Sequence, residues 1–476
     1  MQQRPATHTR TEVVRANDWV LKLSKAWLAV QLTTYGGKYS IERILALDKY
    51  IQQTPLYRAV LVCIAVPTTL ILLVFGQESI PLQDPYEGWS SNYGFWVRVC
   101  LLGAAVGYAA ATYVGYMIDG AALPRRQLAL FTVGVAMSYT AVNIAVAAWL
   151  VFPIPFQAFS TNVFIMFILI GLYRVVVGGS VFREVFARRG ELLAFKNFVL
   201  VQISMLLAYP AFQILFGLVT NTRWEVPVLM ILPIMKLVMK NLMVRTIRHR
   251  EDMIPEEVIF IVDFFDALYL ATCMQNASST TSVIGVVCHH LIQSAVELRE
   301  LRRKTRSTFV RLHKEISRSS ASDNSAERKT VECARLLHDV AEVLFTSECL
   351  VLTEFLETVI PILYGNYVLL MVHLPSAQYH TEMAYVTKEN VAGMVQGIFV
   401  YGFLEWLSCT IVAVIMYRDC GIRALHQLAF VIETQIHLVQ AKLVLYVMIT
   451  LTYRVVHFGT SQHELGGSGL FAIFSL

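Results

Sequence analysis

The chain has 476 residues, of which 56% are hydrophobic and only 15% are charged. Soluble domains usually contain about 25% charged residues, so this composition excludes an ordinary soluble protein and indicates an integral membrane protein. The formal net charge is +5, but the lysines and arginines lie mostly between apolar segments, where they set topology rather than bind nucleic acid. The eight cysteines stand singly with no CxxC pair, which favours free thiols over disulfides or a zinc site.

Residues 1–56 form a basic segment before the first long apolar run. Its lysines and arginines are Arg4, Arg10, Arg15, Lys22, Lys25, Lys38, Arg43 and Lys49. Basic residues beside a span hold their segment in the cytoplasm, so we expect a cytoplasmic N-terminus. Trp19, Leu23, Trp27 and Val30 recur at helical spacing, which predicts a helix lying in the membrane interface. The first seventeen residues contain no apolar core, so the first span is expected to act as an uncleaved insertion signal.

Residues 57–296 form a predicted unit of eight membrane spans. A helix crosses the bilayer with about 20 apolar residues, and the apolar runs of suitable length are 57–75, 95–116, 127–151, 161–178, 198–219, 226–244, 258–272 and 281–296. The basic clusters between these runs all fall on the side of the N-terminal segment, as the positive-inside bias requires. The sequence therefore predicts a regular threading of the chain through the membrane.

Two of these spans carry local signals. The span 95–116 contains small residues at every fourth position, namely Gly103, Gly107, Ala111 and Gly115, and this spacing lets a second helix approach the backbone closely. The span 198–219 contains Pro210, where we expect the helix to break.

The stretch 245–279 fixes the predicted orientation. It begins with a basic cluster, continues through the apolar run 258–272 and ends at Asn276-Ala277-Ser278. The arginines mark the cytoplasmic end of the helix. Asn276 is a possible glycosylation acceptor, which is used only on the opposite side of the membrane.

Residues 297–345 form a basic, serine-rich hydrophilic segment that we interpret as a cytoplasmic linker with a helix. Residues 346–476 form a second membrane unit, with spans at 349–370 and 391–417. In the apolar tract 424–458, the first half is expected to be buried or interfacial and the second half to be the last span, which leaves the C-terminus outside. The predicted fold is therefore an all-α polytopic membrane bundle of about eleven spans.

Ionisable residues inside the spans are the candidate functional residues, because each costs about 2.5–3.5 kcal/mol in a bilayer unless it is paired, hydrated or functional. Asp263 and Asp266 are three residues apart and share one helix face. Lys236 lies at a similar depth in the preceding span, so a Lys236–Asp263 ion pair is expected. One interpretation is a purely structural pair, with Lys240 extending to the interface. The other is a polar path for an ion, proton or small polar solute.

Further acids lie in the C-terminal unit. Glu357 and Glu405 occupy separate predicted spans, so they complete the candidate path with Asp263, Asp266 and Lys236. Glu354 is expected at the interface, because it is close to the cytoplasmic end of its span.

Metal and enzyme motifs are not evident in the sequence. His289 and His290 are adjacent and point about 100° apart on a helix, so no metal ligand or cofactor is predicted. Asp263-Phe-Phe-Asp266 has the DxxD spacing of phosphate-binding membrane transferases, but the accompanying glycine and arginine are missing. The chain also has no GxxxxGK[ST], GxSxG or HExxH pattern, which makes an enzyme the less favoured class.

Three hypotheses of function follow. The leading one is a transporter or channel-like protein for an ion or small polar solute. The alternative is a non-transporting membrane receptor or scaffold, in which the buried charges only fix helix pairing, and the third is a membrane-embedded transferase. The expected partners are the lipid bilayer and such an ion or solute, and not nucleic acid.

Several strings carry a resemblance to a known family. They are YGGKYSIERILALDKY (35–50), QESIPL (77–82), NYGFW (92–96), FPIPF (152–156) and HQLAFVIETQ (426–435). In these strings the chain resembles multipass membrane proteins that recur in oomycetes, a family without an assigned activity. The resemblance covers nearly the whole chain and implies the plasma membrane or an endomembrane of a eukaryote. It implies no catalytic residue, substrate or cofactor.

Overall fold

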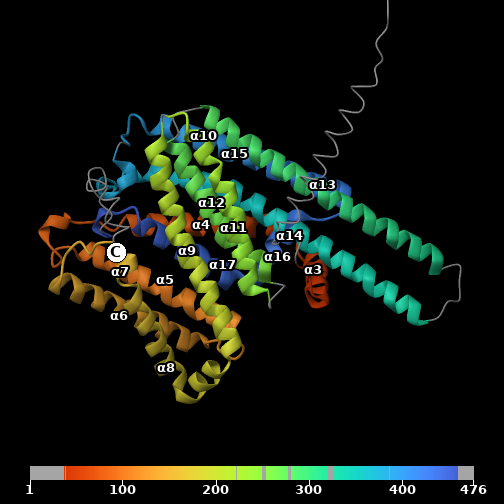
Figure 1. The fold of residues 1–476 in the computed structure, drawn as a ribbon, viewed down its shortest axis with the longest axis horizontal. Helices are drawn as coiled ribbons and strands as arrows, with labels where there is room; N and C mark the ends of the chain where they lie inside the picture. Colours follow the sequence, from red (N-terminus) through yellow and green to blue (C-terminus); the bar gives the residue numbers. More distant parts are fainter. Residues whose placement is uncertain are drawn as a thin grey trace, which may run out of the picture.

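A computed structural model describes residues 37, 39–220, 222–248, 253–276, 280–319, 326–384 and 386–458. The interfacial helix predicted around Trp19 and Trp27 lies outside these residues, as do Ala277 and Ser278 of the glycosylation acceptor. The described part is built from helices, without a β-strand, as the all-α prediction requires (Figure 1).

The longer helices follow the apolar pattern of the sequence. In chain order they are α3 (Ile41–Gln53), α4 (Leu56–Glu78), α5 (Tyr93–Met117), α6 (Arg125–Trp149), α8 (Asn162–Ala187), α9 (Arg189–Val219), α11 (Ile231–Ile247), α12 (Ile254–Asn276), α13 (Thr280–Ser319), α14 (Ala326–Met371), α15 (Val391–Cys420), α16 (Ala424–Thr434) and α17 (Ile436–Thr452). The short elements are η1 (Pro85–Glu87), α7 (Gln157–Ser160), α10 (Glu225–Leu229), η3 (Pro375–Tyr379), η4 (Thr381–Met383) and η5 (Val456–Phe458).

The protein is embedded in a membrane through seven or eight apolar helices. Within the described residues, seven segments are long and apolar enough to cross a bilayer: α4, α5, α6, α8, α9, the pair α10–α11 and α15. The pair α16 and α17 passes the same test together, but it bends by 83° between its halves. The predicted count of about eleven is not confirmed. A count of eleven would require that α12 and parts of α13 and α14 cross the membrane as well.

Three helices differ from their predicted form. Helix α9 continues through Pro210 to Val219, so the predicted break is wrong; a proline removes one backbone hydrogen bond, which kinks a helix more often than it ends it. Helix α13 has 40 residues and α14 has 46, so each extends a predicted span into the hydrophilic segment. At about 1.5 Å per residue α13 is about 60 Å long, and the two helices project side by side beyond the rest of the bundle (Figure 1).

Helix α12 lies at the centre of the bundle. Its neighbours are α9, α11, α14, α15 and α17, and residues 258–262 are completely buried. The C-terminal helices also reach the N-terminal ones, since α16 packs on α4 and α17 on α5. The side chains of α12 are therefore buried inside the protein on every face of the helix.

The close approach predicted for the small-residue stripe is present between α5 and α6. A Cβ atom added to Gly103 would lie 3.1 Å from the Ala136 Cα atom, and one added to Gly107 would lie 3.0 Å from the Val135 Cβ atom. These distances are shorter than ordinary van der Waals contacts, so a larger side chain forces the helices apart.

This packing predicts the effect of a larger residue at Gly107. Gly107→Leu should destabilise the protein by about 1–3 kcal/mol, the usual cost of overpacking, and lower the melting temperature in detergent. The control is Gly171→Leu in α8, because an added Cβ there meets nothing within 4 Å. Equal melting temperatures for the two variants would contradict the close packing of α5 on α6.

Candidate functional site

A group of charged side chains is buried at the middle of α12. Asp263 and Asp266 lie on one face of this helix and are 0% and 3% exposed. Lys236 of α11 lies between them, with its Nζ atom 3.3 Å from Asp263 Oδ1 and 3.4 Å from Asp266 Oδ2. The predicted Lys236–Asp263 ion pair is confirmed.

Lys240 joins the same group from one turn further along α11. Its Nζ atom is 2.9 Å from Asp263 Oδ1, and its side chain is mostly buried. The hydroxyl of Thr353 donates a hydrogen bond of 2.8 Å to the other oxygen of Asp263. The interpretation in which Lys240 extends to the interface is therefore wrong, because the Asp263 carboxylate is a nearer partner than the membrane surface.

Glu357 and Glu405 complete the group from α14 and α15. Glu357 Oε1 is 2.5 Å from Lys236 Nζ, and its Oε2 atom is 3.3 Å from Nδ1 of His290 on α13. Glu405 Oε1 lies 3.8 Å from the same His290 atom. The structure thus brings together all five residues of the candidate path, from four helices. We call Lys236, Lys240, Asp263, Asp266, His290, Glu357 and Glu405 the charge cluster.

Glu354 lies beside the charge cluster rather than at an interface. Its carboxylate is buried and accepts hydrogen bonds from Ser294 at 2.5 Å and Ser408 at 3.2 Å. The prediction of an interfacial Glu354 is wrong because α14 begins long before the predicted span, so position 354 falls deep inside the bundle.

Two further polar residues, Glu433 and Asn276, lie away from the charge cluster. Glu433 is partly exposed and pairs with the exposed Arg58 at 3.0 Å. Asn276 is the last residue of α12, and the rest of its acceptor sequence is outside the described residues.

Polar layers lie at both ends of α12. At its N-terminal end, Arg43 contacts Glu256 and Glu348, and Lys442 Nζ lies 3.0 Å from Glu257. We call these five residues the N-terminal layer. At the other end, Arg98 and His380 contact Glu78, Arg454 contacts Glu382, and Arg454 also donates to Thr272 of α12. Glu78, Arg98, His380, Glu382 and Arg454 are the C-terminal layer.

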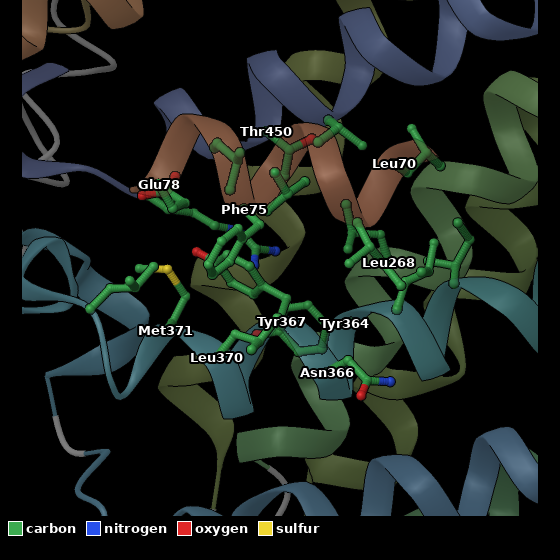
Figure 2. Close-up of a pocket in the computed structure, with 18 of the residues that line it drawn as sticks. Leu70, Phe75, Glu78, Leu268, Tyr364, Asn366, Tyr367, Leu370, Met371 and Thr450 are labelled. Carbon is green, nitrogen blue, oxygen red and sulfur yellow. The ribbon is translucent and has the colours of Figure 1, made fainter. Parts of the chain in front are cut away.

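A cavity of about 90 Å³ adjoins the C-terminal layer, between α4, α12, α14 and α17. Figure 2 shows Tyr364 and Tyr367 of α14 and Leu268 of α12 around it, with Glu78 at one end. Its lining is mainly apolar and includes no residue of the charge cluster. The cavity therefore lies beside the C-terminal layer and is separate from the charge cluster.

The roles of Lys240, His290 and Glu354 in or beside the charge cluster were not predicted from the sequence. Signals for two of them were available. His290, Ser294 and Glu297 follow the i, i+4, i+7 spacing of one helix face. That polar face in an otherwise apolar segment points towards the bundle interior. Lys240 follows Lys236 by one turn, and this spacing likewise predicts a shared partner.

The arrangement is suited to binding positive charge. The charge cluster contains four carboxylates and two lysines. When His290 is neutral, two negative charges therefore remain uncompensated. Such an excess is costly in an apolar interior unless a cation or proton compensates it.

Comparison of the chain with protein-family models, with curated proteins and with solved structures finds no significant match. The resemblance to oomycete membrane proteins therefore stays a prediction.

The ion pairs predict that Lys236 is essential for stability. Lys236→Met leaves three buried carboxylates without their shared partner, a loss that costs about 3–5 kcal/mol in buried pairs. We expect a large fall in the detergent melting temperature, and a partial recovery in Lys236→Met/Glu357→Gln. The control Arg58→Met breaks an exposed pair and should melt like the wild type. A Lys236→Met protein that also melts like the wild type would show that the buried pairs contribute little.

Proposed function

We propose that the protein is a membrane transporter or channel-like protein that moves a cation through the bundle around α12. The supporting observation is the convergence of Asp263, Asp266, Glu357 and Glu405 on one buried site. Burial of ionisable groups at this depth in a membrane protein is costly, and such groups commonly mark ion pathways and proton relays. The excess of carboxylates over lysines favours a cation over an anion.

The polar layers support a path along α12. Glu256 lies seven residues before Asp263, and Gln275, which accepts a hydrogen bond from Tyr364, lies nine residues after Asp266. At about 1.5 Å per residue these steps are about 10 and 14 Å. Polar groups therefore recur along the interface of α12 with α14, from the N-terminal layer through the charge cluster to the C-terminal layer.

A scaffold or receptor is the second candidate. It is favoured by α13 and α14, which project beyond the bundle and offer a surface to a partner (Figure 1). It explains the ion pairs as devices that fix helix register. It does not explain why the carboxylates of the charge cluster outnumber the lysines.

We further propose that the N-terminus and the projecting ends of α13 and α14 lie in the cytoplasm of a eukaryotic cell. The basic residues of the N-terminal segment and of 297–345 support this orientation.

Transport is tested with purified protein in liposomes, with H⁺, K⁺ and Mn²⁺ flux measured separately. Wild-type liposomes should carry at least one of these cations faster than protein-free liposomes. Asp266→Asn and Glu405→Gln should reduce that flux about tenfold or more, since a contact with a charged group is worth about 1.5–3 kcal/mol. Glu433→Gln is the matched control, because this acid lies outside the charge cluster. Absence of flux for all three cations would favour the scaffold.

Orientation is tested by labelling cysteines in intact cells. Cys333 is exposed on α14, so in a variant that retains only this cysteine a membrane-impermeant maleimide should react after permeabilisation and not before. Tyr86→Cys on the same background is the opposite control, because Tyr86 is 98% exposed in the loop after α4. Labelling of Cys333 in intact cells would reverse the proposed orientation.

A further inference from the structure

We propose that His290, Glu357 and Glu405 form a binding site for a divalent transition-metal ion of the Mn²⁺, Fe²⁺, Co²⁺ or Zn²⁺ class. The binding site stands on its geometry. That the same ion is the transported cation rests on the proposed function.

The ligand atoms are spaced for a metal ion. His290 Nδ1 is 3.3 Å from Glu357 Oε2 and 3.8 Å from Glu405 Oε1, and the ligating atoms of the three residues lie within 4.8 Å of one another. Metal–nitrogen and metal–oxygen bonds of about 2.0–2.2 Å place neighbouring ligands of one ion about 3.0–3.6 Å apart. The observed atoms need only small side-chain rotations to meet at one ion.

The His290 ring provides an independent indication of a ligand. Its side chain is 7% exposed, and among the described residues the buried Nδ1 atom has no hydrogen-bond or ion-pair partner other than the carboxylates of Glu357 and Glu405. This atom faces two carboxylates, and the ring packs at 5.9 Å between centroids against the fully buried Tyr401. In the neutral tautomer that carries its proton on Nε2, the imidazole presents the Nδ1 lone pair to the space that the two carboxylates border.

The surrounding residues hold the ligands in place. Lys236 binds Glu357 through Oε1, which leaves Oε2 turned towards His290. Partners that bind the far oxygen of a ligating carboxylate orient it and commonly accompany metal sites. With His290 neutral, as it is when it ligates a metal ion, the two lysines leave two negative charges uncompensated in the charge cluster, and these match the charge of one divalent ion.

The donor set selects the class of metal. Imidazole nitrogen favours Zn²⁺, Fe²⁺ and their neighbours, whereas Mg²⁺ and Ca²⁺ prefer oxygen ligands alone. Carboxylates extend the range to Mn²⁺. No metal was expected from the sequence, because His289 and His290 point in different directions on their helix. In the structure, the partners of His290 come from α14 and α15 instead.

The test is Co²⁺ binding to the full-length protein, purified without a histidine tag and stripped of metal by a chelator. Wild-type protein should bind one Co²⁺ per chain, with the visible absorption bands of a nitrogen- and oxygen-ligated ion. His290→Gln and Glu405→Gln should weaken this binding at least about tenfold, the effect expected for loss of one ligand or its support. His289→Gln is the matched control, because His289 is only partly buried and lies about 100° from His290 around the helix, and it should bind like the wild type.

Two results would overturn the site: no Co²⁺ binding by the wild type, or equal binding by the wild type and Glu405→Gln. The latter variant preserves side-chain size, and its gel-filtration profile and melting temperature show whether it is folded. Flux of H⁺ or K⁺ without Co²⁺ binding would contradict the metal site and support the proposed transporter. Co²⁺ binding without any cation flux would leave the metal site and remove transport.

Discussion

The structure depends on one shared ion-pair arrangement, in which the ammonium group of Lys236 is placed among Asp263, Asp266 and Glu357. Each of these groups is costly to bury alone, so the three helices that carry them are stable only in the register that brings them together. Helix α12 is surrounded on all sides, and its neighbours α11 and α14 are tied to it through this one amine. The same contacts place Glu357 beside His290 and thereby define the site.

Two kinds of helix packing coexist in the bundle. Apolar side chains alone give little association between helices in lipid, because the lipid tails are equally apolar. At the α5–α6 interface, Gly103 and Gly107 let the two backbones approach closely, and the close contact favours association of the helices. The α12–α14 interface is polar instead: hydrogen bonds join the two helices at Asp263 and Gln275, and Lys236 of α11 forms ion pairs with both helices. The charged interface lies at the centre and the small-residue interface towards the edge (Figure 1).

Much of the helix pattern was predictable, because most of the long helices coincide with apolar runs that can be read from the sequence. The Lys236–Asp263 pair was predictable too, because the depth of each residue can be counted from the loop between the two helices. The burial of Glu354 was not: hydropathy does not show that α14 starts far outside the predicted span. Nor could the role of His290 be deduced, since its partners Glu357 and Glu405 are distant in sequence and their meeting depends on the rotation of three helices.

The numbers of buried acidic and basic groups distinguish the two candidate functions, a scaffold and a cation transporter. A scaffold needs each buried acid only as the partner of a buried base, and the N-terminal layer approaches that condition, with Lys442 bound to Glu257 and Arg43 to Glu256 and Glu348. The charge cluster departs from this condition, because it contains four carboxylates and only two lysines. Its remaining basic residue is a histidine, His290. Retaining such an excess in an apolar interior costs stability without improving helix pairing. A cation bound at this site would supply the missing charge, and this is the reason why we propose a cation transporter rather than a scaffold.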